Sequence, residues 1–119
     1  LQREVIMAVM TSVRKVVVLI LKGDIDIEDM LALKGIISTF IEKENLFFVL
    51  DFSAVTHINV SGIEYLNERK ERARALGGDI KIVGSSDYIR NLFIYAGYWG
   101  EFEFYATEED AVRAFDGLI

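Results

Sequence analysis

The residues best suited to chemistry gather just after the apolar run Leu46–Leu50. Asp51, the chain's single histidine His57, and either Ser53 or Ser61 supply a carboxylate, a base and a hydroxyl nucleophile. Such a set could hydrolyse an ester or amide if the three groups converged. The sequence lacks a Gly-x-Ser-x-Gly turn, and three residues from one short loop rarely meet in the required geometry. We therefore predict a surface histidine and a chain that is not an enzyme.

A second chemistry would use Asp51 as a phosphate acceptor at the end of a buried strand. Asp24 and Asp26, in an earlier loop, could help to hold the Mg²⁺ that such a receiver needs. This interpretation is disfavoured because no lysine ends the last predicted strand and because a hairpin opens the chain. We expect Asp51 instead to hydrogen-bond the amides of its own loop.

Composition limits the remaining classes of function. The chain has 119 residues, no cysteine, one histidine and a formal net charge of −6. A thiolate site and a multi-histidine metal site are therefore excluded, and the negative charge disfavours binding to nucleic acid or anionic lipid. The longest aliphatic run, Val16–Leu21, is far shorter than the ~20 residues of a membrane span. Neither a signal peptide nor a Gly-rich nucleotide-binding motif is visible. We expect a single cytoplasmic domain, residues 1–119, without metal or cofactor.

Hydrophobic patterning predicts the element order ββαβαβαβα. The expected strands are 3–12, 14–22, 46–50, 79–83 and 101–105, with a hairpin at 12–15 and a polar loop at 53–59. Asp26 is expected to cap a helix to about residue 44, and a second helix runs from about 60 to 76. Residues 84–87 lead into a third helix, and Thr107 opens a fourth.

This order indicates an α/β fold with a mixed five-stranded sheet and about four helices. Only the first strand pair is antiparallel, because strands that are separated by helices run parallel. Functional loops then lie at the carboxyl ends of the strands. The first two strands are apolar on both faces, so we also expect exposed apolar area near residues 5–10 and a homodimer.

Several local motifs resemble one known family when they are taken in order. Residues 23–26, Gly-Asp-Ile-Asp, are similar to a Gly-Glu-Leu-Asp turn, and residues 50–55, Leu-Asp-Phe-Ser-Ala-Val, are similar to an Asp-Leu-Ser-x-Val strand end. Residues 57–63, His-Ile-Asn-Val-Ser-Gly-Ile, lie where the family carries Asp-Ser-Ser-Gly-Leu. Gly77-Gly78 and the segment 89–97 also fit. The whole chain thus resembles the bacterial anti-sigma factor antagonists, which are STAS domains.

The resemblance implies a non-enzymatic domain that binds an anti-sigma factor, itself a serine kinase, and so frees the sigma factor. In the family, phosphorylation of the first serine of Asp-Ser-Ser-Gly abolishes this binding. Here Val60 replaces that serine and Asn59 replaces the aspartate. Ser61 is the alternative acceptor, although Ser61-x-x-Glu64 also fits a helix capping box, which we favour. The chain is then a constitutive binder, or is regulated by other means.

These arguments place the partner-binding site on the 23–26 turn and the segment 56–64. Its residues are Asp24, Asp26, Thr56, His57, Asn59, Val60, Ser61, Gly62 and Glu64. The alternative is a small-ligand or nucleotide sensor of the same fold, with a pocket near His57.

Overall fold

The computed structural model describes residues 5–11 and 15–116. They form the predicted order of elements, with one added 3₁₀ turn. The elements are β1 (Ile6–Thr11), β2 (Val16–Ile25), α1 (Ile27–Glu42), β3 (Phe47–Ile58), η1 (Val60–Gly62), α2 (Ile63–Ala75), β4 (Asp79–Val83), α3 (Asp87–Tyr95), β5 (Glu103–Tyr105) and α4 (Glu108–Ala114). Residues 12–14 of the predicted hairpin lie outside the described residues.

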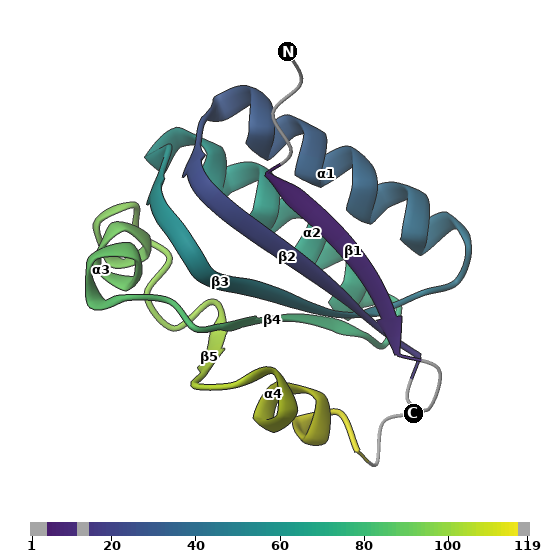
Figure 1. The fold of residues 1–119 in the computed structure, drawn as a ribbon. Coiled ribbons are helices and arrows are strands. Elements are labelled where there is room, and N and C mark those ends of the chain that lie inside the picture. Colours follow the sequence, from purple (N-terminus) through teal and green to yellow (C-terminus); the bar gives the residue numbers. More distant parts are fainter. Residues whose placement is uncertain (1–4, 12–14, 117–119) are drawn as a thin grey trace.

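The strands form one sheet in the sequential order β1-β2-β3-β4-β5 (Figure 1). β1 runs antiparallel to β2, and β2 to β5 are parallel to one another. The prediction of a mixed sheet is confirmed. Because β2 to β5 are parallel, their carboxyl ends reach the same edge, where β2 leads into α1 and β3 leads through η1 into α2.

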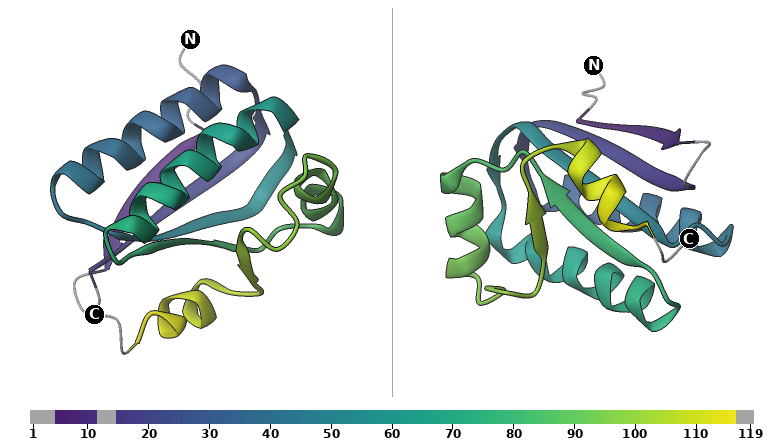
Figure 2. Two further views of the ribbon diagram at one scale, coloured as in Figure 1. Left: turned by 180° about the vertical axis from the view of Figure 1, so that it is seen from behind. Right: turned by 90° about the horizontal axis from the view of Figure 1, so that it is seen from below.

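Helices cover the two faces of the sheet unequally. α1 and α2 lie side by side on one face, and α4 lies on the other (Figure 2). Side chains alternate across a strand, so Val17, Leu19 and Leu21 enter the larger core on the α1 side. Val16 and Val18 enter a smaller core beneath α4. This alternation explains why β2 is apolar on both faces.

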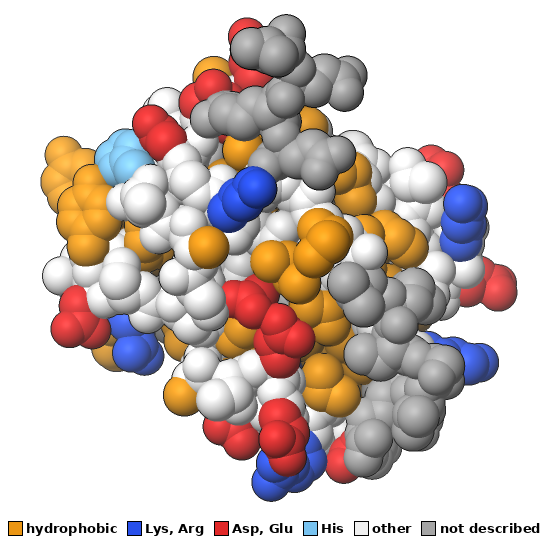
Figure 3. All heavy atoms as spheres, in the orientation of Figure 1, with side chains coloured by type: hydrophobic (Ala, Val, Ile, Leu, Met, Phe, Trp, Pro, Cys, Tyr) orange, Lys and Arg blue, Asp and Glu red, His pale blue; other side chains and the backbone are white. Residues whose placement is uncertain are grey.

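Among the described side chains of β1, residues 6–8, none belongs to the smaller core. Met7 is 56% exposed and borders a hollow of about 120 Å³ that Val5, Ile6, Ile20 and Lys22 also line. Figure 3 shows hydrophobic side chains near the centre of this sheet face. The side chains of residues 9 and 10, which the expectation of an open apolar area included, lie outside the described residues.

Two strands are longer than predicted. β2 continues past Gly23 to Ile25, and β3 continues past Asp51 to Ile58, so the expected polar loop at 53–59 is mostly strand. The parallel pairing resumes after register shifts beside Lys22 and Gly23, where Gly23 adopts a φ of +79°. Such irregularities break the alternation of polar and apolar residues that marks a regular strand. At both shifts the extra residue lies on β3, so Gly23 lies opposite a bulged part of β3 and does not end β2.

Candidate functional site

The pairing of the extended strands joins the two predicted halves of the site. Asp24 of β2 lies opposite His57 of β3, and Ile25 lies opposite Ile58. One residue further on, the Asn59 N–H donates to the Ile25 carbonyl oxygen at 2.8 Å. The 23–26 turn and the segment 56–64 therefore form one continuous surface at the carboxyl edge of the sheet.

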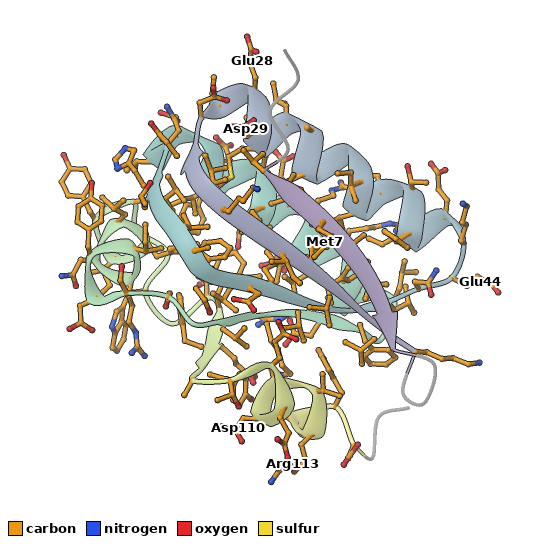
Figure 4. The ribbon with its side chains drawn as sticks, in the orientation of Figure 1. Met7, Glu28, Asp29, Glu44, Asp110 and Arg113 are labelled. Carbon is orange, nitrogen blue, oxygen red and sulfur yellow. The ribbon has the colours of Figure 1, made fainter. Side chains whose placement is uncertain are left out.

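The start of α1 gives this surface its charge. Asp26 caps α1 as predicted: its Oδ1 accepts from the Asp29 N–H at 2.8 Å, and the Asp29 Oδ2 accepts from the Asp26 N–H at 2.9 Å. Figure 4 shows Glu28 and Asp29 at this end of α1. Carboxylates are favourable here because the amino end of a helix carries partial positive charge. Asp24, Asp26 and Glu28 are exposed, so the edge is acidic.

Asn59, and not Ser61, caps the turn that leads into α2. The Asn59 Oδ1 accepts from the Gly62 N–H at 3.1 Å, whereas α2 itself has no side-chain cap. The predicted capping box between Ser61 and Glu64 is therefore wrong. The 3₁₀ turn η1 precedes α2 and moves the cap to the residue before it. Ser61 is exposed, and its hydroxyl forms no hydrogen bond within the described part of the chain.

Gly62 fixes the distance between this turn and α1. It is buried, and a Cβ atom added to it would lie 2.5 Å from the Met30 Cγ, which is closer than atoms pack. Only glycine allows this approach of α1 without a shift of one element. Val60, two residues earlier, is half-buried. Part of the Val60 side chain is therefore packed against the protein, and part is accessible to a partner.

His57 has a partner that the sequence did not indicate. Its Nδ1 lies 2.6 Å from the Tyr88 hydroxyl of α3, and the two rings stack with their centroids 5.8 Å apart. Both residues are exposed. Tyr88 therefore links the candidate site to α3. No local motif marks this pair, because the two residues meet only through the packing of α3 beside β3.

The structure separates Asp51 from His57. Asp51 lies opposite Ile20 and Val83, six residues before His57 on β3, or roughly 20 Å along an extended strand. The two groups cannot act together as a carboxylate and a base. As expected, Asp51 accepts a hydrogen bond from a nearby amide, the Ser53 N–H, at 2.9 Å.

Glu108 of α4 is the carboxyl partner of Asp51, in place of Asp24 and Asp26. The hydrogen bond to Asp51, together with burial and the charge of Asp51, raises the pKa of Glu108 to about 7. Burial disfavours ionised Asp51, but its hydrogen bonds to Glu108 and Ser53 hold its pKa below the ordinary value. Among the described residues, no three acidic or histidine side chains are placed to hold a metal ion. The pair therefore joins α4 to β3 and does not form the acidic site of a receiver.

Comparison with known proteins identifies the family. The model of the STAS domain matches residues 7–111. The chain belongs to the STAS domain family. The resemblance stated from the motifs is confirmed, and the fold of this STAS domain is the mixed sheet with four helices described above.

Several solved structures show the same fold. An anti-sigma factor antagonist from Mycobacterium paratuberculosis is 25% identical, with 92% of each chain covered and a TM-score of 0.75. The anti-sigma factor antagonist SpoIIAA in its unphosphorylated form is 24% identical, with 94% of this chain and 98% of that chain covered and a TM-score of 0.74. A sulfate transporter family protein from Wolinella succinogenes is 22% identical, with 92% and 90% covered and a TM-score of 0.74.

A search of curated proteins gave no match. None of the helices within residues 5–11 and 15–116 combines the length and the apolar character needed to cross a membrane.

Proposed function

We propose that this STAS domain is a regulatory protein-binding module that binds an anti-sigma factor of the serine-kinase type and thereby frees a sigma factor. The observation that supports this proposal is the pairing of Asp24 with His57, which joins the 23–26 turn to the segment 56–64. Two of the similar structures are anti-sigma factor antagonists, which favours this class of partner.

The docking surface consists of Asp24, Asp26, Thr56, His57, Asn59, Val60, Ser61, Gly62 and Glu64. Most of its side chains are exposed, while buried Gly62 holds the turn against α1. A surface of this kind needs no induced folding, because a sheet edge and two helix starts hold its backbone. Its exposed carboxylates favour a partner with basic residues at the contact.

Regulation of this surface cannot use residue 60, because valine has no hydroxyl group. We propose that phosphorylation at residue 60 does not regulate binding. Ser61 is then the adjacent hydroxyl residue of this surface that could accept a phosphate in its place. Asn59 supplies the cap, so the Ser61 hydroxyl is not needed for that role. A phosphate on Ser61 would add a dianion and bulk to a packed interface, close to the carboxylate of Glu64, and would weaken binding. SpoIIAA, one of the similar proteins, has been solved in a phosphorylated form.

A pair of charge reversals tests the docking surface. Glu64→Lys changes an exposed glutamate at the start of α2, and Glu42→Lys makes the same charge change at the far end of α1, outside the surface. Titration calorimetry with the purified anti-sigma factor is expected to show at least a tenfold loss of affinity for Glu64→Lys and little change for Glu42→Lys. Equal affinities for both variants would contradict the proposed surface.

A second proposal concerns self-association through β1. Exposed Met7 and the neighbouring apolar hollow lie on a sheet face that α4 leaves partly uncovered (Figure 4). A second copy of the chain would cover this apolar area. This proposal is independent of the docking surface, which lies at the carboxyl edge of the parallel strands.

A further inference from the structure

A hollow of about 190 Å³ lies between α3, the turn that follows it, and β5. Aromatic and apolar side chains form most of its wall, together with one arginine. Its lining residues are Arg90, Phe93, Ile94, Tyr98, Trp99, Gly100, Phe102 and Phe104. His57 is not among them, so this hollow is separate from the pocket that the sequence placed near that histidine.

The turn after α3 presents a tryptophan at the rim of the hollow. Trp99 is 76% exposed, and neighbouring Ile94 is 44% exposed. Gly97 and Gly100 flank the aromatic pair Tyr98-Trp99, with φ values of +90° and +79° that favour glycine. Tyr98 packs against the core, whereas Trp99 remains outside it. Exposed apolar side chains that gather around a hollow are typical of a contact surface, whereas scattered ones are not.

Arg90 places a positive charge beside this apolar hollow. Its guanidinium carbon lies 5.1 Å from the centre of the Phe104 ring, and the residue is exposed. No ion pair of Arg90 occurs within the part of the chain that the structure describes. An arginine that stacks on an aromatic ring keeps its hydrogen-bond donors available for a planar anion. Arg90 can therefore bind a carboxylate from outside the chain.

A second hollow of about 380 Å³ adjoins the first and shares Arg90 and Phe104 with it. Its other lining residues are Gly84, Ser85, Tyr105 and Ala106. Arg90 thus lines both a mostly apolar hollow and a second hollow that also includes Ser85. Binding sites for small molecules commonly combine an apolar wall with a few polar groups.

We propose that these two hollows bind a small aromatic acid. The aromatic ring lies in the first hollow against Trp99 and Phe104, and the carboxylate binds Arg90. Any polar remainder of the molecule lies near Ser85 in the second hollow. Because the chain has a net charge of −6, it repels anions in general, so the local charge of Arg90 determines where an acid binds. This site is separate from the docking surface, and its test needs no protein partner.

Trp99 is the only tryptophan of the chain, so tryptophan fluorescence reports directly on this site. The experiment titrates the purified chain with phenylacetate and, separately, with phenylacetamide, which has nearly the same shape but no charge. Arg90→Gln removes the anchoring charge, and Arg72→Gln makes the same change at an exposed position of α2 outside the hollows. Circular dichroism verifies that each variant is folded.

The expected result is a saturable change of Trp99 emission with phenylacetate in the wild type and in Arg72→Gln. Affinity should fall at least about tenfold for phenylacetamide and for Arg90→Gln, because both changes remove a charge-assisted hydrogen bond. The proposal is overturned if phenylacetate gives no saturable change, if phenylacetamide binds equally well, or if Arg90→Gln binds phenylacetate like the wild type.

Discussion

Asp24 and His57 lie opposite each other in the parallel register of β2 and β3. They are far apart in the sequence, yet this pairing brings the acidic start of α1 beside the residues that precede α2. The docking surface depends on this register. Changes that disturb the approach of these elements should therefore affect stability, whereas changes of exposed side chains on the surface should affect binding.

Gly62→Ala should destabilise the domain because the new methyl group would collide with Met30 of α1. We expect the free energy of unfolding to fall by about 1–3 kcal/mol, the usual cost of overpacking. Gly35→Ala is the matched control: it lies in α1 with no atom within 4 Å of the added Cβ, so it should stabilise the helix by roughly 0.5–1 kcal/mol. Urea unfolding measures both, and a harmless Gly62→Ala would contradict the close approach.

Glu108 should make stability depend on pH near neutrality. Its pKa is about 7 in the folded chain against an ordinary value of 4.5, so the folded state holds more protons between these values. The free energy of unfolding should therefore decrease as the pH rises from about 5 to 7. At a pH below both values Glu108 is protonated in the folded and unfolded states. Its stabilising contribution is then fully present and no longer depends on pH.

Glu108→Gln tests this prediction because the amide can still donate to Asp51 but does not titrate. Urea unfolding between pH 5 and pH 8 should show a flatter pH dependence for Glu108→Gln than for the wild type. Glu109→Gln, an exposed neighbour on α4, should retain the wild-type slope. If the stabilities of Glu108→Gln and the wild type changed with pH in parallel, the raised pKa of Glu108 would be contradicted.

The Asn59→Asp, Val60→Ser double variant should restore a phosphorylation site. Aspartate retains an oxygen that can accept from the Gly62 N–H, so the cap is preserved. Val60 is half-buried, and we expect the double change to cost no more than about 1 kcal/mol. After incubation with the anti-sigma kinase and ATP, mass spectrometry should find phosphate on residue 60 of the variant and none on residue 60 of the wild type. Phosphate on wild-type Ser61, with loss of binding, would identify Ser61 as the switch.

Tyr88→Phe should separate binding from stability. It removes the hydroxyl that lies 2.6 Å from the His57 Nδ1, while ring stacking is retained. Because both residues are exposed, the free energy of unfolding should change by less than about 0.5 kcal/mol. Affinity for the anti-sigma factor should fall a few-fold, since His57 loses the contact that orients it. Tyr95→Phe, at an 83% exposed position of α3, is the control and should bind like the wild type.

Met7→Lys should prevent self-association if β1 is its interface. Sedimentation velocity over a range of concentrations should show a dimer for the wild type and a monomer for Met7→Lys. A wild-type chain that stays monomeric at high concentration would remove this proposal.

Much of the fold follows from local patterns. The aliphatic run Val16–Leu21, the continuous apolar run in β3 and the Asp26 cap each indicate their element without knowledge of the rest of the chain. The extension of β2 and β3 could not be predicted, because two bulges in β3, between Asp51 and His57, interrupt the alternation of apolar and polar residues. Because β3 continues to Ile58, the polar residues from Ser53 to His57, which we expected in a loop, lie on a strand.

The parts of the candidate site that contain a local sequence motif could be predicted. The 23–26 turn and the segment 56–64 were recognisable in sequence, but the contacts of His57 with Tyr88 and of Asp51 with Glu108 were not. Both contacts join residues that are distant in the chain, and they depend on where α3 and α4 pack against the sheet. The Ser61 prediction failed for a related reason: the motif Ser-x-x-Glu is present, but a preceding 3₁₀ turn gives the capping role to Asn59.

Release of a sigma factor tests the central claim most directly. A preformed complex of the anti-sigma factor with a fluorescently labelled sigma factor is titrated with this chain, and fluorescence anisotropy follows the fraction of free sigma factor. We predict release by the wild-type chain, with Glu64→Lys requiring at least a tenfold higher concentration and Glu42→Lys acting like the wild type. A folded wild-type chain that leaves the complex intact at all concentrations would contradict the account.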